Sequence, residues 1–259
     1  MNRRLIILIF LFFLVWLGLT LRYKTLPFYG DQIALISHPA NLFYDNNFTN
    51  LIIPDDYNTG HPPLLPVFFA VVWKIFGKSL EVSHWAMFVV VITLFYSFVT
   101  LCNRFIAVKK HWIPFLLFSA HPVIITQTLG MSTDIFLVLF FLMGINAVLS
   151  KRTVFFLICC MLLLLSSLRG IIYVAVLGLL YFFVEKDYSP KNIFKTVFVL
   201  LIAALPFISW NIFHNVHTGW CIVNPESPWR EHRQVVSGVG LAQNVFIYFF
   251  RLAETGFVF

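Results

Sequence analysis

Long apolar stretches without a charged residue alternate with short polar segments along most of this chain. The first stretch runs from Leu5 to Leu21, between Arg4 and Arg22, and it lacks a small-residue cleavage site, so it predicts an uncleaved signal anchor. Further stretches without Asp, Glu, Lys or Arg predict six more membrane-spanning helices, near residues 84–101, 112–130, 134–150, 153–168, 170–184 and 194–210. The pattern therefore predicts an all-α polytopic membrane protein with about seven transmembrane helices.

The apolar segment 63–77 decides the orientation of every later helix. It has about 15 residues, follows two prolines and carries Lys74, which is typical of a re-entrant or juxtamembrane helix rather than a span. If the segment does not cross, ten Lys and Arg face the cytoplasm and eight face outward. If it crosses, the inner count falls to seven and the outer count rises, so the positive-inside rule favours the first arrangement. We expect a cytoplasmic N-terminus and a first outer loop, residues 22–83, that packs on the membrane surface as short helices.

Composition and charge support this class. Of the 259 residues, 60% are hydrophobic and only 11% are charged, which excludes a water-soluble globular enzyme, a disordered chain and a coiled coil. The net charge of +7 divides, in this topology, into +8 on the inner face and −1 on the outer face. The basic balance is therefore a topology signal. We expect a multi-pass protein of the inner (plasma) membrane, with membrane lipids and no nucleic acid as partners.

Two segments of the first outer loop contain candidate functional residues. Asp31 follows the first span by ten residues, and a carboxylate at the mouth of a bilayer can act as a general base. The alternative is a helix cap or a solvated acid. The segment Tyr57-Asn58-Thr59-Gly60-His61-Pro62-Pro63 fixes a rigid entry to the next helix. There His61 could bind a phosphate or orient a substrate, with Tyr57 beside it, or the segment could be a simple turn.

Two further candidates lie at the ends of predicted spans on the same side. Asp134 follows Ser132 and Thr133, and it is either a site residue or an ordinary first-turn acid. Arg169 interrupts an apolar stretch of 32 residues, where it could hold a lipid phosphate or merely extend to the membrane surface. The middles of the predicted spans contain almost no ionisable side chain, which argues against ion-coupled transport. The four cysteines show no metal or disulfide spacing.

This arrangement resembles the GT-C superfamily of polytopic membrane glycosyltransferases. The resemblance covers about residues 1–210 and is carried by the signal anchor, the loop acid Asp31, the motif His61-Pro62-Pro63-Leu64 and the sequence Ser132-Thr133-Asp134. Leu168-Arg169-Gly170 lies where the family often has a basic residue and a glycine. The most similar group is that of the protein O-mannosyltransferases and the bacterial lipid A aminoarabinose transferases.

The resemblance implies an activity and roles for these residues. Members transfer a sugar from a polyprenyl-phosphate donor to a lipid, glycan or protein acceptor on the extracytoplasmic side, in cell-envelope synthesis or protein glycosylation. Transfer of a hexosyl or pentosyl group, with inversion, would use Asp31 as the base on the acceptor and Asp134 to shape the site. Arg169 would bind the carrier phosphate. No cofactor is certain, and a divalent metal stays open.

The resemblance also implies a domain division. Residues 1–210 would form the GT-C-like transmembrane core, and residues 211–259 an extracytoplasmic or interfacial segment. Because family members are usually longer, we expect a short or truncated chain in which this segment starts a missing C-terminal half. The alternative function is that of a non-enzymatic polytopic membrane protein, either a lipid-linked glycan transporter or an inactive assembly subunit.

Overall fold

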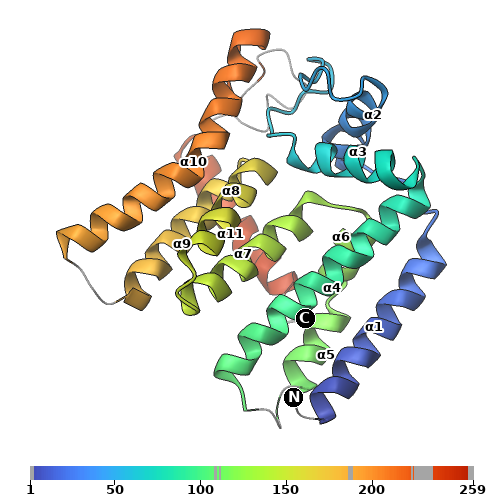
Figure 1. Ribbon diagram of the computed structural model, residues 1–259, viewed down its shortest axis with the longest axis vertical. Coiled ribbons are helices and arrows are strands. Elements are labelled where there is room, and N and C mark those ends of the chain that lie inside the picture. The colour runs from blue at the N-terminus through green and yellow to red at the C-terminus, as the bar shows by residue number, and fades with distance from the viewer. Residues whose placement is uncertain are drawn as a thin grey trace.

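The chain is helical throughout the part that the structure describes. The computed structural model describes residues 3–107, 110, 112–185, 189–222, 224 and 236–255. Within them are eleven α-helices and one π-helical turn, η1, which confirms the predicted all-α class (Figure 1). Their bounds are α1 Arg3–Tyr23, η1 Ile33–Ser37, α2 His38–Asp45, α3 Leu64–Phe76, α4 Leu80–Phe105, α5 Trp112–Ala120, α6 Pro122–Leu129, α7 Thr133–Leu149, α8 Thr153–Ser166, α9 Gly170–Glu185, α10 Pro190–Thr218 and α11 Gly238–Thr255.

Three helices are long and apolar enough to cross a membrane by themselves. They are α1, α4 and α10, and the bent pair α5 and α6 makes a fourth candidate if it counts as one span. Helices α7, α8 and α9 have 17, 14 and 16 residues, shorter than the about 20 that a perpendicular span needs. Length and composition therefore support a multi-pass protein with three or four candidate spans among the described residues.

The predicted helix 112–130 is broken in the middle. Helix α5 ends at Ala120, His121 is extended, and α6 starts at Pro122 with a bend of 48° between the two axes. Proline lacks the amide hydrogen that a continuous helix needs, and it disfavours helical backbone in the residue before it. The break is thus explained by one residue, Pro122.

The loop 22–83 forms short helices, as the sequence predicts. Helix α3 follows Pro62 and Pro63 and ends where Gly77 adopts a positive φ of 94°. In Figure 1, α3 lies across the upper end of the bundle, with α2 above it and α4 continuing from its end. Polar contacts fasten α3 and the turn after it to their neighbours, since the Trp73 indole of α3 donates to Ser83 Oγ at 2.8 Å and Lys78 of the turn pairs with Asp45 at 3.2 Å.

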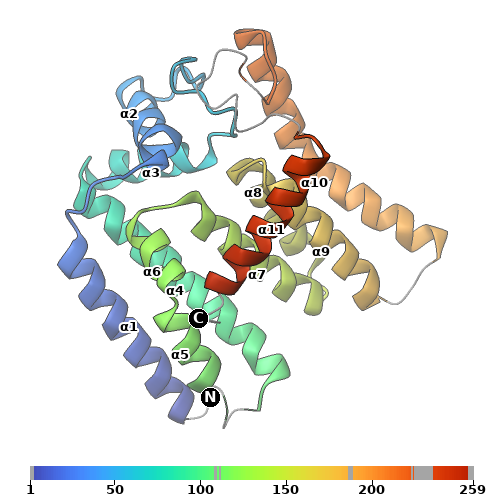
Figure 2. The same cartoon turned by 180° about the vertical axis from the view of Figure 1, so that it is seen from behind.

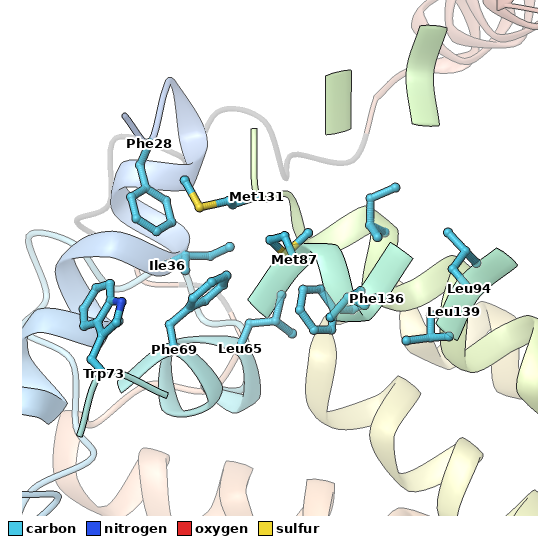
Figure 3. Close-up of a cluster of buried hydrophobic side chains, with 13 residues drawn as sticks. Phe28, Ile36, Leu65, Phe69, Trp73, Met87, Leu94, Met131, Phe136 and Leu139 are labelled. Carbon is cyan, nitrogen blue, oxygen red and sulfur yellow. The ribbon is translucent and has the colours of Figure 1, made fainter. Parts of the chain in front are cut away.

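A buried apolar cluster joins this loop to the bundle. Phe28 and Ile36 from the loop, Phe69 from α3 and Met131 from the turn before α7 belong to one cluster (Figure 3). Figure 3 shows the Met131 side chain extending toward the Phe28 ring. Burying each large apolar side chain contributes roughly 1.5–3 kcal/mol when it leaves water. The packing therefore fixes the segment around Asp31 against the turn that precedes Asp134.

Helix α7 is the centre of the bundle. It packs against α4 on one side and against α8 and α9 on the other, and α8 also contacts α10. Figure 2 shows the same order from behind, with α1, α4 and α5 on one side of α7 and α8, α9 and α10 on the other. At one end of the bundle Lys24 pairs with Glu81, and at the opposite end Arg104 donates to the Leu149 carbonyl. The contacts thus join residues that the sequence-derived topology assigns to the same side.

Candidate functional site

Three of the five residues predicted for the site lie together. Arg169 Nη1 donates to Asp134 Oδ1 at 2.8 Å, and His61 Nδ1 accepts a hydrogen bond from the backbone N–H of Leu168 at 3.3 Å. We call His61, Asp134, Ser167 and Arg169 the helix-end cluster, because each lies at or just before the start of a helix. The residues come from segments more than 30 positions apart in sequence. The fold therefore brings His61, Asp134 and Arg169 into one polar cluster.

A strained turn positions Asp134. Met131 adopts a positive φ of 56°, which costs a non-glycine residue energy and persists only where packing enforces it. Its side chain is completely buried, so the apolar cluster provides that packing. Ser132 then caps α7, its hydroxyl accepting from the Asp134 N–H at 3.2 Å. The turn places the Asp134 carboxylate in the first turn of α7, facing Arg169.

A second tight turn positions Arg169. Ser167 Oγ accepts from the Arg169 N–H at 3.3 Å, and the Gly170 N–H donates to the Ser167 carbonyl at 2.8 Å. A Cβ on Gly170 would lie 2.0 Å from the carbonyl oxygen of Leu163, a backbone atom that cannot move aside. Only glycine lets α9 start this close to the end of α8. The sequence Leu168-Arg169-Gly170 thus has a structural reason for its glycine.

The hydrogen bond to His61 assigns its proton. Because the Leu168 N–H can only donate, Nδ1 of His61 is the acceptor, and the neutral ring holds its hydrogen on Nε2. Gly60, directly before it, has a φ of 71°, a conformation that favours glycine. Pro62 and Pro63 then lead into α3. His61 is therefore held against the α8–α9 turn with an N–H donor on its other nitrogen.

The helix-end cluster offers hydrogen-bond donors to an anion. The N-terminal ends of α3, α7 and α9 meet there, and helix N-termini attract negative charge. The ends of α6 and α8 lead into the same turns and oppose these dipoles, and Asp134 offsets the charge of Arg169. The side chains of Arg169 and Asp134 are 67% and 42% exposed, and such a pair stabilises the fold by only about 0–1 kcal/mol. Its main effect is to orient a guanidinium that has further N–H donors.

An apolar groove lies beside the helix-end cluster. It has a volume of about 350 Å³ and runs between the start of α3, the end of α8 and the middle of α10. Its lining residues are Leu51, Pro63, Leu64, Val67, Leu165, Pro206, Ser209, Trp210 and Phe213. Pro63 and Leu165 are each two residues from a member of the cluster, His61 and Ser167. The segments that carry His61 and Ser167 therefore also contribute to the wall of the groove.

The other two predicted residues lie elsewhere on the same loop. Asp31 is exposed at the start of the helical segment that continues through η1, and Gly30 before it has a φ of 56°. No hydrogen bond or ion pair of the Asp31 carboxylate is seen within the described ranges. Tyr57 stacks on His38 with ring centroids 4.9 Å apart, and both line a separate cavity of about 220 Å³. Neither Asp31 nor Tyr57 is in direct contact with the helix-end cluster in the part of the chain that the structure describes.

The sequence gives no signal for a further group of polar contacts beside His61. Asn58 and His214 are hydrogen-bonded at 2.8 Å although 156 positions separate them, and Trp220 Nε1 donates to Asp55 Oδ1 at 3.0 Å. His214 and Trp220 lie in residues 211–259, for which the sequence predicts an extracytoplasmic or interfacial segment. No spacing motif in the sequence indicates that Asn58 pairs with a residue so far along the chain.

Neither a metal site in the described part of the chain nor a relative points to the function of this protein. Among the described residues no group of three His, Cys, Asp or Glu side chains could hold a metal ion. Comparisons with protein-family models, with curated proteins and with solved structures gave no match to this chain. Function therefore has to be argued from the helix-end cluster and the groove themselves.

Proposed function

We propose that this protein is a membrane glycosyltransferase that takes a sugar from a polyprenyl-phosphate donor and passes it to a lipid, glycan or protein acceptor. The observation that supports the proposal is that two N–H donors, Arg169 and His61, lie in the same chain segments as Leu165 and Pro63, which line an apolar groove of about 350 Å³. A polyprenyl phosphate has two parts that match them, an anionic phosphate for the N–H donors and a long hydrocarbon chain for the groove. The match in chemistry supports this donor class over a water-soluble nucleotide sugar.

The proposed reaction breaks the bond between the sugar C1 and the phosphate oxygen and forms a bond from C1 to the acceptor hydroxyl oxygen. Asp31 takes the hydroxyl proton, and the electron pair of the broken bond leaves with the carrier phosphate. Arg169, oriented by Asp134, stabilises the charge that develops on that phosphate, and His61 donates to it from Nε2. A single base with displacement from the opposite face predicts inversion at C1, unlike the two-carboxylate retaining scheme.

In this proposal the protein has seven spans, with α7, α8 and α9 crossing although they are short. Short apolar helices can cross where the bilayer thins locally or where neighbours cover their ends. The ion pair of Lys24 with Glu81 and the contact of Arg104 with Leu149 support one common side for each set of helix ends. The cell inner membrane, with the helix-end cluster facing outward, is the location that the charge distribution favours.

Cysteine labelling tests the seven-span topology. Asp56→Cys and Lys151→Cys, each in a background with Cys221→Ser, introduce exposed thiols at opposite ends of the bundle. In intact cells we expect an impermeant maleimide to label position 56 and to label position 151 only after the membrane is opened. Equal labelling of both positions in intact cells would contradict the topology.

Filling the groove tests the donor class. Ser209 lines the groove from α10, so Ser209→Trp should obstruct a hydrocarbon chain there, whereas Val216→Trp, on an exposed position of the same helix, should not. We expect the Kd for polyprenyl phosphate, measured with protein in nanodiscs, to rise about tenfold in the first variant and to stay within twofold in the second. Equal affinity in both variants would place the carrier chain outside the groove.

A further inference from the structure

The loop that carries His61 is fastened by the far end of α10. Asn58 is 2% exposed and His214 is 4% exposed, and their side chains meet at 2.8 Å between Nδ2 and Nε2. Asn58 also donates to the Ile53 carbonyl at 3.1 Å and accepts from the Gly60 N–H at 3.0 Å. Figure 1 shows the end of α10 beside the segment that precedes α3. We call the contact between Asn58 and His214 the latch.

The partners of the latch determine which atoms hold the hydrogens. The Ile53 carbonyl can only accept and the Gly60 N–H can only donate, so the Asn58 amide has one orientation, with Nδ2 as the donor. His214 Nδ1 lies 3.2 Å from the Trp220 carbonyl, which also can only accept, so Nδ1 holds the ring hydrogen. His214 Nε2 is then a bare acceptor for Asn58. Every polar atom of the latch is satisfied only when His214 is neutral with its hydrogen on Nδ1.

We propose that His214 is a positioning residue that holds His61 at the helix-end cluster through Asn58. The path runs from His214 to Asn58, from Asn58 to the Gly60 N–H, and from the next residue, His61, to the Leu168 N–H beside Arg169. Because its role is to place a phosphate-binding histidine, the inference rests on the proposed function. The latch also lies near the apolar groove, since Trp210, one helical turn before His214, lines that groove.

Two substitutions of His214 separate its two hydrogen bonds. In His214→Gln the amide oxygen reaches the former Nε2 position and can still accept from Asn58, whereas the Trp220 contact is lost. In His214→Asn the shorter side chain retains a donor for the Trp220 carbonyl but no longer reaches Asn58. Asn58→Asp keeps the acceptor for Gly60, and its carboxylate would accept from a protonated His214 Nε2, so this variant replaces the hydrogen bond by an ion pair. His217→Asn, an exposed histidine on the same helix, serves as the control.

Hydrogen exchange of the full chain in nanodiscs measures the latch directly. Loss of a buried hydrogen bond should raise the exchange rates of the Gly60 and Leu168 amides about tenfold in His214→Asn. We expect rates within threefold of wild type in His214→Gln and His217→Asn. Wild-type rates in His214→Asn would overturn the proposal. So would equal increases in His214→Gln and His214→Asn, because His214 would then act by packing alone.

Two further readouts keep the inference separate from the proposed function. The ¹⁵N chemical shifts of His214 in the wild-type protein should report the Nδ1–H tautomer, and an Nε2–H tautomer would overturn the latch. If exchange changes as expected and the wild-type protein transfers no sugar, the latch stands and the proposed function fails. If sugar is transferred and exchange is unchanged in the variants, the latch fails and the function stands.

Discussion

Asp31→Asn should reduce the rate of sugar transfer by about 10²–10⁴-fold, because it removes the proposed general base without changing the size of the side chain. The Kd for polyprenyl phosphate should stay within twofold of wild type, since the carboxylate would contact the acceptor and not the carrier. The exposed position of Asp31 on the outer loop means that folding should be unaffected. Initial rates in proteoliposomes, together with the melting temperature of the purified protein, measure both expectations.

Asp45→Asn is the matched control for this variant. Asp45 is an exposed acid of the same loop and pairs with Lys78, a surface contact that contributes about 0–1 kcal/mol. Its substitution should leave the transfer rate within twofold. If Asp31→Asn transfers sugar as fast as Asp45→Asn, then Asp31 is not the base, and its alternative interpretation as a helix cap or a solvated acid is favoured.

Arg169→Gln should have the second largest effect, and it should weaken binding of the polyprenyl-phosphate sugar donor. Charged hydrogen bonds contribute roughly 1.5–3 kcal/mol, so losing the guanidinium should weaken polyprenyl-phosphate binding by about ten- to a hundredfold. The transfer rate at saturating donor should fall by about 10²–10³-fold as well, because the developing phosphate charge loses its partner. Binding in nanodiscs and initial rates in proteoliposomes separate the two effects.

Arg22→Gln provides the comparison for Arg169→Gln. Arg22 is an exposed arginine near the C-terminal end of α1, where Lys24 pairs with Glu81, so it tests whether general positive charge at that end of the bundle is enough. We expect its donor affinity to remain within twofold of wild type. Similar losses in the two variants would mean that Arg169 acts as a surface charge, and the assignment of a phosphate site at the helix-end cluster would be wrong.

Much of the helical framework follows from the apolar pattern alone. The predicted segments 134–150, 153–168 and 170–184 correspond to α7, α8 and α9 within two residues at most ends. The long helix α10 exceeds its predicted range at both ends, because Ser189 caps it and Pro190 is compatible with its first turn. The sequence contains Pro122 at the bend, but a proline alone does not predict a break, since α10 continues through Pro206. The segment 112–130 is apolar on both sides of Pro122, so its apolar content alone predicts one continuous helix.

The candidate site was also predictable only in part from the sequence. Topology predicts a common side for His61, Asp134 and Arg169, but the contact between Arg169 and Asp134 depends on Gly170 and on the buried Met131 turn. Those are packing details that no spacing pattern encodes. The latch between Asn58 and His214 joins residues 156 positions apart, so only the folded chain reveals it. Local chemistry was thus predictable, and long-range pairing was not.

The most direct test of the account is whether the wild-type protein releases sugar from its carrier. Purified protein in proteoliposomes would be supplied with polyprenyl-phosphate hexose or pentose and with a cell-envelope lipid fraction as acceptor. The account predicts that free polyprenyl phosphate and glycosylated acceptor form at equal rates, and that both products disappear in Asp31→Asn. Tight binding of the carrier with no release of sugar from either donor would contradict it and would favour a non-enzymatic carrier-binding protein.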